Sequence, residues 1–151
     1  MASYFLCLDP DIPKPITNFS FASPRVGDHA FLNAVRFLEK TKQLRIVRVV
    51  NENDSITAAP TVGYSHVGFQ VRLYAKGWFS QKEPNIEYKS PKFSWSQNKM
   101  YAYRNSHFAH FNLSNDHGGY RKRIEKGKTK LESKNLNNMY NDPKIVGFKL
   151  E

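Results

Sequence analysis

The feature that most constrains this chain is a nearly continuous aliphatic run, LRIVRVV (Leu44–Val50), which leads straight into the polar segment NENDS. Only Arg45 and Arg48 interrupt the run. Apolar side chains on both faces are typical of a strand in a parallel sheet, because a half-solvated antiparallel strand alternates apolar and polar residues. We therefore predict a buried parallel strand over residues 44–51, followed by a loop that contains Asp54.

The segments before this run predict the crossover that a parallel sheet requires. Residues 2–8 favour the end of a helix, which the following prolines close. Residues 16–22 alternate and predict a strand, and Asp28 has the residue type of an N-cap for a helix to about Lys42. Strand, helix and strand in this order indicate a right-handed crossover. The helix should bury a stripe formed by Phe31, Ala34, Val35 and Leu38. Its polar residues should lie mostly away from that stripe: Asn33, Arg36, Glu39 and Lys40.

The later segments are less regular. Residues 64–74 (YSHVGFQVRLY) alternate and predict a half-buried strand at an edge of the sheet. Residues 81–105 have no firm period and are interpreted as a loop or irregular segment. A helix is predicted from about Asp116 through much of the following basic segment, and residues 144–151 indicate a short strand. In the alternating strand four side chains should face one way: Val67, Phe69, Val71 and Leu73.

Composition indicates a globular chain of one domain or less, with 151 residues of which 40% are hydrophobic and 14% aromatic. Much of the net charge of +10 lies in residues 121–134. Such a basic stripe can meet nucleic acid or anionic lipid head groups, or it can be a solvated face.

The single cysteine, Cys7, excludes a disulfide framework within the chain and a Cys-rich metal site, and we expect it to be a small buried residue. No segment approaches ~20 apolar residues, and no basic region precedes the short apolar run at the amino terminus, so neither a membrane span nor a secretory signal is predicted.

Asp54 has two interpretations on local evidence. In open α/β sheets, functional residues lie beyond the carboxyl ends of the strands, where Asp54 falls. Asn and Asp also stabilise turns, and local evidence alone favours a turn. Five histidines are candidates for a base beside it, and His29, in the first turn of a helix, is expected at the surface. The pair His107 and His110 indicates packing rather than a metal site, since no third ligand is evident.

Three stretches, taken together, carry a resemblance to a known family. FSFASPRVGDHAFLNAV, RIVRVVNENDSITAAP and GYSHVGFQVRLY resemble the carboxyl-terminal half of the class 3 (fungal lipase-like) lipases, in the same order and spacing. The resemblance covers residues 16–74 and thins beyond Tyr74 to one Asp-His pair. It implies an α/β fold, the carboxyl-terminal part of an α/β-hydrolase over residues 1–151, in which a mostly parallel sheet ends between flanking helices. It also implies a Ser-Asp-His triad in that chain order.

The resemblance assigns roles to two residues of this chain. Asp54 corresponds to the carboxylate that orients the base, and His117, in SNDHGGY, corresponds to the base, which lies late in the family, before a helix and near an aromatic residue. His66 is the weaker alternative, because its counterpart resembles a structural strand histidine. In the SPRVGD element, Ser23, Pro24, Arg25 and Gly27 are expected to set a loop.

The nucleophile is missing from the pattern. A nucleophile elbow requires G-x-S-x-G, and the nearest stretch, GYSHV, lacks the second glycine and follows Asp54. By the resemblance, MASYFLCL continues the helix of the elbow, so the serine and the oxyanion donors would precede Met1.

The implied activity is hydrolysis of lipid carboxylic esters, such as acylglycerols, at an interface, without metal or organic cofactor. The chain alone is not expected to catalyse it. Residues 121–134 could then meet an anionic membrane surface. The alternatives are a non-catalytic pseudoenzyme that pairs with another hydrolase chain and a basic protein that binds lipid or nucleic acid. Nucleic acid is the weakest of these, because aromatic residues do not interleave with the basic stripe.

Overall fold

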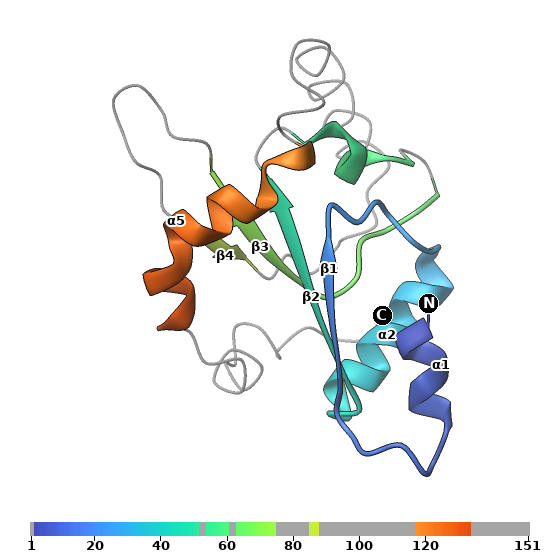
Figure 1. Cartoon of the computed structure of the whole chain (residues 1–151). Helices are drawn as coiled ribbons and strands as arrows, with labels where there is room; N and C mark the ends of the chain where they lie inside the picture. The colour runs from blue at the N-terminus through green and yellow to red at the C-terminus, as the bar shows by residue number, and fades with distance from the viewer. Residues whose placement is uncertain (1, 52–53, 61–62, 75–84, 88–116, 134–151) are drawn as a thin grey trace.

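The computed structural model describes residues 2–51, 54–60, 63–74, 85–87 and 117–133. Its elements, in chain order, are α1 (Ala2–Leu8), β1 (Ile16–Phe21), α2 (His29–Lys40), β2 (Leu44–Asn51), the 3-10 helix η1 (Ser55–Ala58), β3 (Phe69–Leu73), β4 (Asn85–Glu87) and α5 (Tyr120–Glu132) (Figure 1). None of the helices in these ranges is long and apolar enough to cross a membrane.

The strands form one sheet in the order β1-β2-β3-β4. β1, β2 and β3 are parallel, and β4 runs antiparallel to β3. Helix α2 connects β1 to β2, so the predicted strand, helix and strand over residues 16–51 are confirmed. Every residue of β2 except Arg45 is buried, as the aliphatic run predicts for a strand with neighbours on both faces. The α/β class is therefore confirmed, with three parallel strands.

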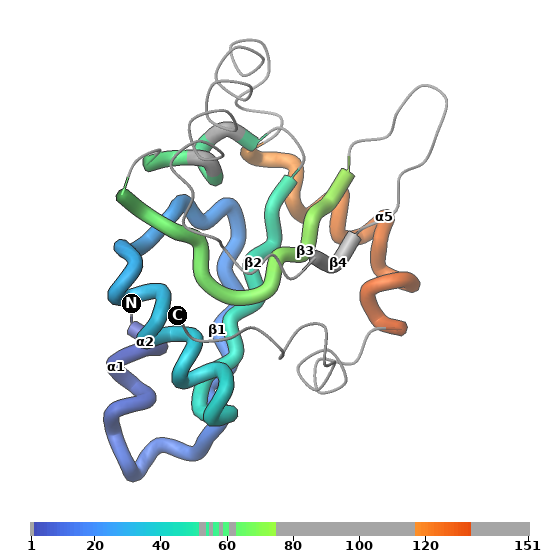
Figure 2. The backbone as a smooth tube through the Cα atoms, turned by 180° about the vertical axis from the view of Figure 1, so that it is seen from behind, coloured from blue at the N-terminus to red at the C-terminus, as the bar shows by residue number. Residues whose placement is uncertain are grey.

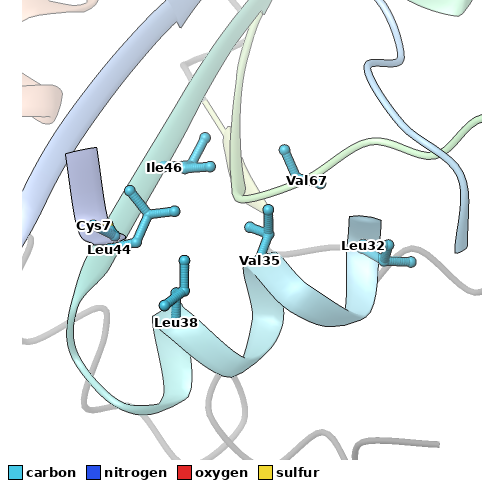
Figure 3. Packing of buried hydrophobic residues seen from close by; sticks show 7 residues of the cluster. All are labelled: Cys7, Leu32, Val35, Leu38, Leu44, Ile46 and Val67. Atoms are coloured by element: carbon cyan, nitrogen blue, oxygen red, sulfur yellow. The ribbon is translucent and has the colours of Figure 1, made fainter. Parts of the chain in front are cut away.

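The sheet is covered on two faces, which we call the α2 face and the α5 face. Figures 1 and 2 show α5 on one side of the sheet and α1 and α2 on the other. On the α2 face the buried cluster contains Cys7, Leu32, Val35, Leu38, Leu44, Ile46 and Val67 (Figure 3). On the α5 face it contains Val47, Val49, Val71, Leu73 and Tyr120. Alternate residues of β2 enter the two clusters, because successive strand side chains point to opposite faces.

Helix α2 begins as its sequence predicts. The Asp28 side chain accepts a hydrogen bond from the Phe31 N–H at 2.9 Å and so satisfies one of the free donors at the start of the helix. The helix ends at Lys40, and Lys42 adopts a positive φ of 60°. The predicted polar side was partly wrong, because Arg36 and Glu39 are both buried. The Glu39 carboxylate accepts a hydrogen bond from the Ile46 N–H at 3.4 Å, which gives this buried acid a partner inside the fold.

The prediction for β3 was wrong in its extent and its position. The strand begins at Phe69 and lies between β2 and β4, so within the described sheet it is not at an edge. Before it, Gly68 has a φ of +77°, and a Cβ there would collide with the backbone oxygen of Ile46. Because the chain turns at this glycine, Val67 packs on the α2 face, whereas Val71 and Leu73 pack on the α5 face.

Two further predictions concern the later part of the chain. Strand β4 lies within residues 81–105, which were expected to be irregular, and the other positions of that span lie outside the described residues, as do residues 144–151. The predicted basic helix is confirmed as α5, which starts at Tyr120 rather than near Asp116.

Candidate active site

Asp54 lies in the first turn after β2, with its side chain fully buried. The Asp54 N–H donates to the carbonyl of Asn51 at 3.2 Å, so the chain turns as soon as the strand ends. Asp54 is the N-cap of η1, and its Oδ1 accepts from the Ile56 N–H at 3.1 Å. Asp54 therefore does stabilise a turn, as local evidence favoured. Capping uses one carboxylate oxygen and leaves the other for further partners.

The structure brings His117 to this carboxylate across 63 residues of sequence. The His117 Nδ1 atom lies 3.2 Å from Asp54 Oδ2 and 3.4 Å from Oδ1. An ionised carboxylate only accepts hydrogen bonds, so the neutral imidazole facing it carries its proton on Nδ1. The other ring nitrogen, Nε2, is then unprotonated, and 42% of the side chain is exposed. A buried carboxylate that orients a partly exposed imidazole in this tautomer is the arrangement of a general base.

Tyr120 completes the surroundings of Asp54. Its hydroxyl donates to Asp54 Oδ2 at 2.6 Å and accepts from the Asn51 N–H at 3.0 Å. Burial and the hydrogen bond to Asp54 raise the pKa of Tyr120 above its usual range, so the phenol stays protonated and remains a donor. The ring packs in the α5-face cluster, with the edge of Phe21 against it at 6.3 Å between ring centroids.

Sequence reasoning did not name Tyr120 as a site residue. The signal was the aromatic residue three positions after His117 in HGGY, since this spacing places both side chains on one side of a helical turn. The two glycines between them make the turn without adding a side chain. The first residue of α5 and the turn before it thus bring two partners to one carboxylate.

The remaining histidines have different surroundings or lie outside the described residues. Burial, followed by the charges of Arg48 and Arg25, lowers the pKa of His66 to about 2, while a hydrogen bond with the backbone of Thr57 opposes this shift. Within the described part of the chain, no hydrogen bond joins His66 to Asp54. His29 is exposed on α2, as expected, and His107 and His110 lie outside the described residues. Among the residues that the structure describes, no group of three His, Cys, Asp or Glu side chains could hold a metal ion.

The SPRVGD element connects to the loop that follows Asp54. The buried Arg25 donates from its backbone N–H to the Ala59 carbonyl at 2.8 Å and from its guanidinium to the Pro60 carbonyl at 2.9 Å. Gly27 pairs with Ser65 in an isolated antiparallel bridge. These contacts hold the end of η1, and hence the turn at Asp54, against the start of α2.

Together, these features define a class of protein: an α/β fold in which an Asp-His pair follows a central parallel strand. Comparison with known proteins agrees, because the family model described as Lipase (class 3) matches residues 1–64. Residues 1–64 are thus similar to class 3 lipases. No solved structure matches it.

Its relatives among characterised proteins are plant enzymes. Phospholipase A1-IIgamma of Arabidopsis thaliana is 46% identical over 59 residues, and Phospholipase A1-IIalpha of the same plant is 46% identical over 54. Phospholipase A1-II 2 of Oryza sativa subsp. indica is 40% identical over 59 residues. These alignments cover 36–39% of this chain and only 12–14% of the relatives.

Proposed function

We propose that this chain supplies the orienting carboxylate and the general base of a Ser-Asp-His triad that hydrolyses carboxylic esters of lipids. Residues 1–151 would then be the carboxyl-terminal portion of a class 3 lipase-type α/β-hydrolase domain, with Asp54 as the orienting carboxylate and His117 as the base. The names of the relatives make phospholipids, together with acylglycerols, the substrates to test first. The observation that carries the proposal is the hydrogen-bonded pair of Asp54 and His117 at the end of β2.

The chemistry follows from the geometry of this pair. A serine hydroxyl near His117 Nε2 would lose its proton to that atom as it attacks the ester carbonyl. Asp54 would stabilise the imidazolium that forms, and the Tyr120 hydroxyl would hold Asp54 in place. The protonated His117 would then donate to the departing alcohol, leaving an acyl-serine that water hydrolyses through the same base.

The serine would come from residues outside this sequence, which contains no G-x-S-x-G. β1 is the last strand on its side of the described sheet, and Phe19 and Phe21 on it are more than half exposed. A further parallel strand beside β1, carrying the elbow at its carboxyl end, would bring the serine to the same sheet end as Asp54. The 151 residues alone would be inactive, because loss of one triad member costs several orders of magnitude in rate.

A chimera tests this proposal. The part of the Arabidopsis thaliana Phospholipase A1-IIgamma that precedes the aligned segment is joined to residues 1–151, and release of fatty acid from phosphatidylcholine and from a monoacylglycerol is measured. We expect the chimera to hydrolyse lipid esters and the 151-residue chain alone to show none. Asp54→Asn and His117→Ala should each lower kcat by about 1,000-fold or more.

The matched control is His29→Ala, which removes an exposed histidine far in sequence from the pair and should leave kcat unchanged. Circular dichroism confirms that each variant folds. An active chimera that keeps its kcat in the His117→Ala variant would exclude His117 as the base.

A further inference from the structure

The main chain of Asp54 has hydrogen-bond partners of its own, besides those of its side chain. Its N–H donates to the Asn51 carbonyl at 3.2 Å, and its carbonyl accepts from the Thr57 hydroxyl at 2.7 Å. Thr57 lies in η1 and is 4% exposed, so water does not compete for this bond. A hydroxyl at this distance from its acceptor forms a good hydrogen bond. Together the two bonds fix the peptide groups on both sides of the Asp54 Cα atom.

Thr57 is in turn tied to the segment before β3. A hydrogen bond joins His66 to the backbone of Thr57, and because this bond favours the protonated ring, a ring N–H donates to the Thr57 carbonyl. His66 Nδ1 is buried without a hydrogen-bond partner, so Nε2 makes the bond. The neighbouring Ser65 accepts from the Val26 N–H at 3.3 Å and donates to the Gly27 carbonyl at 2.7 Å. Thr57 is therefore held by a second part of the chain.

The bond between Asp54 and His117 tolerates little displacement. His117 Nδ1 lies 3.2 Å from Oδ2 and 3.4 Å from Oδ1. Most N–H···O bonds are about 2.9–3.0 Å long, so a shift of the carboxylate by a few tenths of an ångström away from the ring would weaken this one steeply. The Tyr120 hydroxyl holds Oδ2 at 2.6 Å but does not hold the main chain. The position of the Asp54 main chain thus decides whether the carboxylate reaches the imidazole.

We propose that Thr57 is a positioning residue: its hydroxyl holds the main chain of Asp54 so that the carboxylate meets His117 Nδ1. The inference rests on the proposed function and deepens it, because it names a residue that acts on the pair without touching the reacting atoms. A threonine with a purely structural role would affect only stability. Substitution separates the two parts of this side chain, since valine removes the hydroxyl and serine removes the methyl group.

The first test observes the His117 ring directly and requires no catalysis. The full 151-residue chain is labelled with 15N-histidine, and the ring 15N shifts at alkaline pH report which nitrogen carries the proton. The signal that disappears in His117→Ala belongs to His117. We expect protonation on Nδ1 in the parent. Thr57→Val should lower the Nδ1-protonated fraction by about half or more, because the hydrogen bond of the ring sets its tautomer. Thr57→Ser should keep the parental fraction.

The matched control is Thr41→Val at the end of α2. The Thr41 hydroxyl also donates to a backbone carbonyl, that of Phe37 at 2.9 Å, so the substitution removes the same atom from the same kind of bond. Thr41 is the C-cap of α2 and makes no printed bond to the turn at Asp54. Thr41→Val should therefore leave the His117 signal as in the parent, even where the loss of a hydrogen bond lowers the denaturation midpoint.

The second test measures kinetics in the chimera. Thr57→Val should lower kcat about tenfold with KM unchanged, because a displaced carboxylate no longer orients the base. Thr57→Ser should restore kcat to within about threefold of the parent. Thr41→Val should leave kcat unchanged. An inactive chimera together with the expected His117 signals in the 151-residue chain would contradict the proposed function and still support the role of Thr57 in the pair.

Four results would overturn the proposal. A parental His117 signal in Thr57→Val would mean that the hydroxyl does not position Asp54. Equal losses in Thr57→Ser and Thr57→Val would assign the effect to side-chain packing, and equal losses in Thr41→Val and Thr57→Val would indicate a response to stability alone. If circular dichroism shows that Thr57→Val does not fold, the hydroxyl supports the whole fold rather than the pair.

Discussion

The two faces of the sheet are built in different ways and serve different ends. The α2 face is made by residues from the first half of the chain, between Cys7 and Val67, around a helix that Asp28 caps. The α5 face joins β2 and β3 to a helix that begins 69 residues after the end of β2 and 47 residues after the end of β3, and the N-cap of that helix, Gly119, makes no side-chain hydrogen bond. The first face holds the fold together, whereas the second assembles the partners of Asp54. Contacts within the first half of the chain thus hold the fold together, and the docking of a later helix brings the partners of Asp54 to it.

The largest expected effect on folding tests the structural role of the α2 face. Leu32 is 1% exposed in its cluster, so Leu32→Ala should lower the free energy of unfolding by about 2–5 kcal/mol through lost burial and a cavity. The control on the α5 face is Leu131→Ala, where the side chain is only partly buried and the loss should be smaller. Urea denaturation followed by circular dichroism measures both. A larger loss at Leu131 would reverse the contrast between the faces.

A smaller effect follows from His66, which lies beside Arg48 of β2. The folded pKa of His66, about 2, is below the value of 6.5 expected for an unfolded chain. Between these values the unfolded state binds the extra proton, so the free energy of unfolding falls as pH falls below 6.5. From pH 6.5 to pH 4.5 the fall should be about 2 kcal/mol for this one group.

Carboxylates also titrate toward the lower end of this range, so the test compares slopes. In His66→Gln, the fall in the free energy of unfolding between pH 6.5 and pH 4.5 should be about 2 kcal/mol smaller than in the parent. Denaturation midpoints at several pH values report it. Identical slopes in the two proteins would mean that His66 is not buried as a neutral group.

The smallest effect concerns the α5 face, where Tyr120 supports the site. Tyr120→Phe keeps the ring in its cluster and removes the hydroxyl that bonds Asp54 and the Asn51 N–H. Stability should fall by about 1.5 kcal/mol, because buried polar groups lose a partner. In the chimera, kcat should fall about tenfold with KM unchanged, since Asp54 would be held less firmly.

The Tyr120→Phe variant also distinguishes two roles of Tyr120: holding Asp54 through its hydroxyl and packing its ring in the α5-face cluster. A role in packing alone predicts that Tyr120→Phe leaves kcat unchanged, whereas Tyr120→Leu, which removes the ring, lowers the denaturation midpoint. If Tyr120→Phe lowers the denaturation midpoint but keeps the full kcat, Tyr120 contributes to stability and does not position Asp54 for catalysis.

Much of the fold was predictable from short stretches. The run of residues 44–51 predicted a buried strand, and the structure places β2 on that range. Asp28 predicted the start of α2 because an N-cap requires a short side chain whose oxygen can accept from the first turn. The positions of Arg36 and Glu39 were not predictable from periodicity. Glu39 is buried because the neighbouring strand offers it a backbone donor, which no helical pattern contains.

What the sequence by itself determined is therefore local: the β1-α2-β2 unit, the turn at Asp54 and the basic helix. These depend on periods of 2 and 3.6 residues and on caps, which act within a few positions. The tertiary structure alone decided that β3 pairs with β4 as well as β2, that His117 Nδ1 lies 3.2 Å from Asp54 Oδ2, and that the Tyr120 hydroxyl donates to the same oxygen. Contacts between residues 63 and 66 positions apart leave no periodic trace, because they arise only when the helix docks on the sheet.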